Sequence, residues 1–139
     1  MMLFVRRKST KKQGKVKNAT PNEYDGIKFR SKLETYTYKK LKEAKIKADY
    51  EKHRFELLPA FTFGGKKYRP MTYLPDFVGD GFIIECKGYP NEAWPLREKL
   101  FNYYLYRREI DVKFYIVHNQ KQVDELIKHL KGCCFSIHY

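Results

Sequence analysis

The dipeptide Asp80-Gly81 constrains the fold of this chain more strongly than any other feature. It lies between two apolar segments, residues 74–78 and 82–87, and Asp-Gly is a preferred sequence for the two-residue turn of a β-hairpin. With these residues in the turn, opposed residues have numbers that sum to 161, as 80 and 81 do. This register predicts that Asp76 lies opposite Glu85. The first segment can also continue a strand that precedes it.

The opposed carboxylates of Asp76 and Glu85 are unfavourable for the fold by themselves. Their Cβ atoms are expected ~4.5–5.5 Å apart, and two charges ~5 Å apart repel by roughly 3 kcal/mol at an effective dielectric near 20. A divalent cation such as Mg²⁺ turns this repulsion into binding, because it prefers carboxylate oxygens. Lys87 follows Glu85 by two residues and therefore projects on the same face. A lysine beside a metal-bound phosphate can orient water and neutralise negative charge, which predicts phosphodiester hydrolysis.

The remaining segments predict a mixed α/β domain with one central sheet flanked by helices. Ser31-Lys32-Leu33-Glu34 has the spacing of a capping box at the start of a helix. Gly64-Gly65 marks the turn of a second hairpin, and Gly132 marks the end of the last helix. In chain order, the expected elements are a helix at 31–44, strands at 54–63, 67–73, 74–78 and 82–87, a helix at 94–107, a strand at 112–118 and a helix at 122–131.

The net charge of +13, from 29 Lys and Arg against 16 Asp and Glu, favours a polyanionic partner such as nucleic acid. Residues 1–22 are expected to form a flexible basic arm and residues 23–139 a single domain. The alternative for the arm is a solvated tail without a role. The expected DNA contacts come from the arm and from two helix starts: Arg6, Arg7, Lys8, Lys11, Lys12, Lys32, Arg97 and Lys99. For Arg97 and Lys99, a solvated helix face is an equal alternative.

The sequence has no signal-peptide core and no segment of membrane-spanning length. Cys86, Cys133 and Cys134 lack the spacing of a metal finger, which favours a reducing compartment. We therefore expect a soluble, cytoplasmic protein.

Pro75-Asp76 followed by Glu85-Cys86-Lys87 is similar to the PD-(D/E)-x-K signature of a large nuclease superfamily. The likeness extends over roughly residues 27–117. KFRSKLE at 28–34, Tyr50-Glu51, YLPDF at 73–77 and IECKG at 84–88 resemble the phage-type junction-resolving endonuclease I in the same order. Residues 55–77 and REKLF at 97–101 also resemble small phage-encoded nucleases of this superfamily.

This resemblance implies a restriction-endonuclease-like core and a metal-dependent DNA endonuclease. Glu34, Asp76 and Glu85 then correspond to acidic active-site residues and Lys87 to the catalytic lysine. One or two Mg²⁺ ions, replaceable by Mn²⁺, would be held by Asp76, Glu85, the backbone carbonyl of Cys86 and Glu34. The resemblance also implies branched DNA as the substrate, four-way junctions in particular. A homodimer is expected because symmetric cutting needs two active sites, and the likeness suggests a phage protein that acts in the host cytoplasm.

Each site residue also has a purely structural alternative. The third position of a helix is where a capping-box glutamate belongs, so the helix cap and the active site compete for Glu34. Asp76 can simply follow a proline in a turn, and Glu85 with Lys87 can form a surface ion pair of little energetic consequence. The flanking Ile83 and Ile84 predict a buried strand, where unpaired charges are costly, and so favour a functional role. Glu51 is either a secondary acidic residue of the site or an exposed glutamate at the end of a strand, and the second interpretation is favoured.

Two other functions compete with junction resolution. One is a nuclease of the same fold that acts on ordinary duplex or nicked DNA. The other is a non-catalytic protein that binds nucleic acid through its basic surface.

Overall fold

The computed structural model describes residues 21–89 and 91–135, with side chains up to residue 132. A central sheet of four strands has the order β10-β9-β8-β3. Its strands are β3 (Ala48–Tyr50), β8 (Phe77–Gly79), β9 (Phe82–Cys86) and β10 (Lys113–Val117). Strands β9 and β10 run parallel, whereas the other two pairs are antiparallel. The mixed α/β class is therefore confirmed.

Strands β8 and β9 form the hairpin that positions the acidic side chains described below. Phe77 pairs with Ile84 and Gly79 with Phe82, so the predicted register is confirmed. Gly81 has φ +77°, a left-handed conformation that favours glycine in a tight turn. Strand β8 begins only at Phe77, later than expected, because the chain bends at Asp76.

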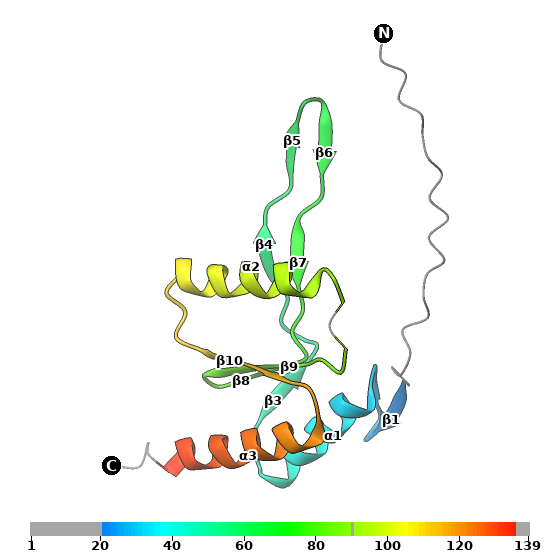
Figure 1. Ribbon diagram of the computed structural model, residues 1–139, viewed down its shortest axis with the longest axis vertical. Coiled ribbons are helices and arrows are strands. Elements are labelled where there is room, and N and C mark those ends of the chain that lie inside the picture. Colours follow the sequence, from blue (N-terminus) through cyan, green and yellow to red (C-terminus); the bar gives the residue numbers. More distant parts are fainter. Residues whose placement is uncertain (1–20, 90, 136–139) are drawn as a thin grey trace.

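Helices cover both faces of this sheet, as expected (Figure 1). Helices α1 (Lys32–Glu43) and α3 (Gln120–Phe135) lie on one face and α2 (Trp94–Arg107) on the other. Side chains of β9 alternate between the two apolar cores: Phe82, Ile84 and Cys86 contact the α1–α3 side, whereas Ile83 contacts the α2 side. Glu85 and Lys87 share the side of Ile83 by the same alternation.

The predicted bounds of helices α1 and α2 are confirmed, whereas those of α3 are wrong. Helix α1 is capped by Ser31 and Ala44, and α2 begins at Trp94 with Pro95 in its first turn. Helix α3 begins at Gln120 and continues through Gly132 to Phe135. Gly132 does not adopt the positive φ by which a glycine ends a helix.

Three short strands add to the expected set. Strands β1 (Asn22–Tyr24) and β2 (Ile27–Phe29) pair about a turn at Asp25-Gly26. Strand β1 starts at the last residue of the predicted arm, and residues 1–20 of that arm lie outside the described part. Strand β3 was not predicted, because three residues are too few for a periodic pattern.

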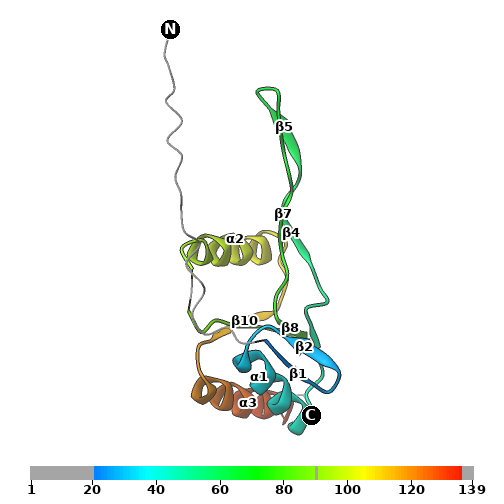
Figure 2. The same ribbon diagram turned by 90° about the vertical axis from the view of Figure 1, so that its right-hand side faces the viewer.

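The predicted second hairpin is confirmed, and it projects from the body of the molecule (Figures 1 and 2). Strands β4 (Phe55–Leu58) and β7 (Met71–Tyr73) form its base, and β5 (Phe61–Phe63) and β6 (Lys66–Tyr68) form its end. Pro59 and Pro70 lie between the two ladders, where a residue without an N–H interrupts strand pairing. None of the helices in residues 21–89 and 91–135 is long and apolar enough to cross a lipid bilayer.

Candidate active site

A pocket rich in charged residues lies where the base of the projecting hairpin meets β8, β9 and the start of α2. Four carboxylates and four cationic side chains line it: Glu34, Glu51, Asp76, Glu85, Arg30, Arg54, Lys87 and Arg97. The structure therefore brings all four predicted catalytic residues, Glu34, Asp76, Glu85 and Lys87, to one pocket.

Asp76 lies at the bend before β8, with only 7% of its surface exposed. Its Oδ2 accepts a hydrogen bond of 2.7 Å from the backbone N–H of Cys86, on the neighbouring strand. Burial raises the pKa of Asp76 to about 9, and repulsion by Glu85 and Glu34 adds to this shift. At neutral pH this carboxyl group therefore retains its proton.

Glu85 projects from β9 and is also buried. Tyr73 donates a hydrogen bond of 2.5 Å to its Oε2, and the ammonium of Lys87 lies 3.2 Å from its Oε1. Burial raises the pKa of Glu85, an effect that these two donors partly offset. The pKa of Tyr73 is itself raised by burial and by the neighbouring carboxylate, so its hydroxyl stays protonated and keeps donating.

Lys87 follows β9 directly, and its backbone N–H donates to the carbonyl of Val117 on β10. Its ammonium lies 4.5 Å from the ring centroid of Trp94, besides its contact with Glu85. A carboxylate and an aromatic face therefore hold this cation at the wall of the pocket.

Glu34 is both the capping-box glutamate of α1 and a lining residue of the pocket. Ser31 caps α1, since its hydroxyl oxygen accepts from the backbone N–H of Glu34. The Glu34 carboxylate in turn accepts from the Ser31 hydroxyl (3.0 Å), from the backbone N–H of Arg30 (3.3 Å) and from the hydroxyl of Tyr50. The capping bonds hold this carboxylate at the pocket, so capping the helix does not exclude a place in the pocket lining.

Glu51 lines the pocket, so the favoured interpretation of it as an exposed strand-end glutamate is wrong. It directly follows β3, but its side chain is only 21% exposed and forms an ion pair of 3.0 Å with Arg30. Its φ of +44° and its N–H bond to the carbonyl of Asp76 turn the chain toward the pocket. The likeness at Tyr50-Glu51 was the one signal in the sequence that pointed to this residue.

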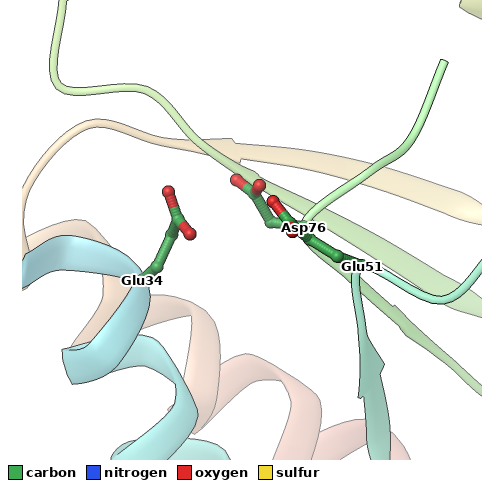
Figure 3. Close-up of side chains that lie close together, drawn as sticks. All are labelled: Glu34, Glu51 and Asp76. Atoms are coloured by element: carbon green, nitrogen blue, oxygen red, sulfur yellow. The ribbon is translucent and has the colours of Figure 1, made fainter. Parts of the chain in front are cut away.

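Three of the carboxylates come close enough to share a cation. One oxygen from each of Glu34, Glu51 and Asp76 lies within 4.8 Å of the others (Figure 3). The oxygens of Glu85 instead face Tyr73 and Lys87. The expected metal ligands were Asp76, Glu85, the Cys86 carbonyl and Glu34; the geometry groups Glu51, rather than Glu85, with Asp76 and Glu34.

The thiol of Cys86 is not available as a ligand in this pocket. It lies on the opposite side of the sheet, 3.4 Å from the hydroxyl of Thr37, and burial raises its pKa well above the usual value. The nearby acidic side chains reinforce this shift.

Only some of the residues predicted to contact DNA line the pocket. Arg97 lines it, whereas Lys32 and Lys99 are exposed outside it. Arg30 and Arg54, which were not predicted, also line it; Arg54 donates to the hydroxyl of Thr72 at 3.0 Å. The remaining candidates, Arg6, Arg7, Lys8, Lys11 and Lys12, lie outside the described residues.

Comparison with known proteins gives one match. Residues 14–124 match the family described as "Protein of unknown function (DUF1064)". No curated protein and no solved structure matches the chain.

Proposed function

The chain belongs to the DUF1064 family, and we propose that it is a metal-dependent endonuclease that hydrolyses DNA phosphodiester bonds. One observation carries this proposal: a strongly basic chain buries Asp76, Glu85 and Glu34 around one pocket, beside Lys87. Buried carboxylates that repel one another lower stability, so their convergence requires a reason beyond the fold.

The side chains of the pocket fit a hard divalent cation. Their donors are carboxylate oxygens, which Mg²⁺ and Mn²⁺ prefer. Within residues 21–89 and 91–135, Asp76 forms no ion pair, and its pKa is raised by burial and then by the nearby Glu85 and Glu34, which the Cys86 N–H and Lys87 only partly offset. Asp76, Glu34 and Glu51 would hold one ion, and Glu85 with the Cys86 carbonyl are candidates for a second. When bound, such an ion polarises the scissile phosphate and lowers the pKa of a coordinated water.

Lys87 acts on the attacking water and on the phosphate. Its ammonium donates hydrogen bonds to both, which orients the water for in-line attack and balances charge on the phosphorane-like transition state. Glu85 and Trp94 hold the lysine in place before the substrate arrives.

Three arginines, Arg30, Arg54 and Arg97, line the same pocket and are suited to bind phosphates that flank the cut. A mixed sheet with helices on both faces supports a restriction-endonuclease-like core as the finer fold class. Three further parts of the proposal rest on the resemblance to junction-resolving endonuclease I: a preference for branched DNA, a homodimeric state and a phage origin. Symmetric cutting of a four-way junction requires two such sites.

The decisive experiment incubates the full chain with four-way junction, linear duplex and single-stranded DNA, each in Mg²⁺ or in EDTA. Lys87→Ala and Asp76→Asn are compared with Lys128→Ala and Asp111→Asn, which change exposed residues outside the pocket. We expect Mg²⁺-dependent cleavage by the wild type and both controls, and none by the two pocket variants, which should still bind DNA.

The outcomes separate the competing functions. A non-catalytic binding protein would cleave none of the substrates in a metal-dependent way, and its DNA binding would be unchanged or improved in Asp76→Asn. Equal cleavage of all three DNAs would remove the junction preference and keep the nuclease. A monomer by light scattering at working concentration would contradict symmetric junction resolution.

A further inference from the structure

The end of the projecting hairpin, strands β5 and β6, exposes aromatic side chains that a folded domain ordinarily buries. Phe63 is 76% exposed, Phe61 51% and Tyr68 39%. The hairpin stands away from the sheet and the helices (Figures 1 and 2). A cluster of exposed apolar side chains is typical of an interaction surface.

Strand pairing gathers these side chains on one face. Phe61 pairs with Tyr68 and Phe63 with Lys66, and directly opposed residues project to the same side of a ladder. The rings of Phe61 and Tyr68 are stacked, with centroids 4.7 Å apart and planes 9° apart. The ammonium of Lys66 lies 5.0 Å from the centroid of Tyr68. This face therefore combines flat apolar rings with a cation.

The charge of the hairpin selects the kind of partner. Residues 57–75 contain Lys66, Lys67 and Arg69 and no acidic residue. An apolar protein groove would satisfy the rings and leave three cations without partners. Nucleic acid satisfies both groups, because bases stack on aromatic rings while phosphates bind lysine and arginine.

The hairpin is continuous with the acidic pocket. Strand β6 leads into β7, whose last residue, Tyr73, donates to Glu85. Tyr68 and Asp76 are eight residues apart (76 minus 68), so at ~3.3 Å per residue they lie at most roughly 26 Å apart. One DNA molecule can reach both.

We infer that strands β5 and β6 form an arm that binds unpaired nucleotides of the DNA molecule that occupies the acidic pocket. Phe63 and the Phe61–Tyr68 stack receive unstacked bases, and Lys66, Lys67 and Arg69 bind the adjoining phosphates. Paired bases inside a duplex offer no free face, so the arm recognises a branch, bulge or single-stranded segment. This inference rests on the proposed function for the identity of the polymer and for its place in the acidic pocket.

The test measures DNA binding by the full chain in EDTA, so that cleavage plays no part. One probe is a fully paired duplex, and the other carries a three-nucleotide bulge with 2-aminopurine at its centre. The Phe61→Ser/Phe63→Ser variant is compared with Tyr106→Ser, which changes an equally exposed aromatic residue on α2 (78%). We expect the double variant to raise the Kd for bulged DNA about 5- to 100-fold and to leave the duplex Kd nearly unchanged. Quenching of 2-aminopurine should occur with wild type and disappear in the double variant.

A second variant tests the cations. Lys66→Gln/Lys67→Gln should reduce the slope of log Kd against log salt by about 1.5, since each phosphate contact contributes roughly 0.7–0.9. The inference would be overturned by an equal loss of affinity for bulged DNA in Tyr106→Ser, or by an equal loss of affinity of the double variant for the paired duplex. A change in oligomeric state with unchanged DNA binding would also overturn it. Failure of the nuclease proposal would appear separately, as binding that depends on the arm without metal-dependent cleavage.

Discussion

The acidic pocket and the projecting hairpin both depart from the usual distribution of side chains, in opposite directions. The pocket buries Asp76 and Glu85 at 7% and 5% exposure, whereas the hairpin leaves Phe63 76% exposed. The buried charges are held by hydrogen bonds from several elements, so changes there should alter both folding and activity. The exposed rings are not part of either apolar core of the described residues, and Phe61 stacks on Tyr68 of the same hairpin, so changes there should alter binding alone. For both regions, the unusual distribution of side chains is what motivates the proposed binding partners: a metal ion at the pocket and unpaired DNA at the hairpin.

The largest expected effect is in the pocket, where Asp76→Asn removes a carboxylate that would hold the metal ion. Cleavage should fall by about 100- to 1,000-fold or more, the typical loss when an electrostatic group is removed from an active site. The metal-free variant should nevertheless unfold at the same or a higher temperature, because Asn is neutral, as the Asp76 carboxyl group is below its pKa of about 9. Gel cleavage assays and thermal denaturation check the two parts. Loss of activity accompanied by a much lower melting temperature would contradict this prediction.

Addition of Mg²⁺ should stabilise the wild-type protein, because the ion binds the folded pocket and not the unfolded chain. At a concentration 100 times its Kd, the gain is about 2.7 kcal/mol, roughly 5–10 °C in melting temperature for a domain of this size. Asp76→Asn should abolish the gain, and Asp111→Asn should retain it. An equal shift in both variants would indicate a general salt effect.

Stability without metal should fall as the pH rises from about 4 to about 9. Asp76 has a pKa of about 9 when folded and near 4 when unfolded, so the native state binds more protons throughout this window. The stabilisation that comes from the proton on Asp76 is complete below about pH 4 and is lost as the pH rises through about 9. The raised pKa of Glu85 changes the stability in the same direction. Urea denaturation in EDTA at pH 5, 7 and 9 should show a smaller decline for Asp76→Asn. Identical pH profiles for both proteins would contradict the shifted pKa.

A smaller effect should follow from Tyr73→Phe, which keeps the buried ring and removes the hydrogen bond to Glu85. We expect a loss of about 1–3 kcal/mol in the free energy of unfolding, the usual range for a hydrogen bond to a charged group. The control Tyr36→Phe removes a comparable bond of 2.6 Å to Asp124, outside the pocket, and should cost less because water can replace the lost donor. Urea denaturation measures both, and an equal cost would show that burial of Glu85 does not strengthen the bond.

The features that the sequence predicted correctly are those that local chemistry determines. A two-residue turn at Asp80-Gly81 fixes every pair of the β8–β9 ladder, and thus the place of Asp76 relative to Glu85. Ser31 and Glu34 similarly fix the start of α1. These features depend on neighbours along the chain, so they can be predicted without the rest of the fold.

The features that were missed depend on contacts between distant segments. Glu51 enters the pocket because β3 pairs with β8 and because its own backbone takes a positive φ. Neither is visible in the residues around it. The exposure of Phe61 and Phe63 also depends on the rest of the chain, since an apolar strand pattern ordinarily predicts burial. Only the fold shows that no described segment covers them.

The smallest expected effect, that of Phe63→Ser on stability, tests the comparison from the hairpin side. The ring is mostly exposed, so its removal should change the free energy of unfolding by less than about 0.5 kcal/mol. Phe101→Ala, at a fully buried ring, should cost about 3–5 kcal/mol. Urea denaturation of both variants, with unchanged m-values, measures the contrast. A cost above 1 kcal/mol for Phe63→Ser would mean that another part of the chain covers the hairpin in solution. The aromatic face would then belong to the core, and the two regions would no longer differ in kind.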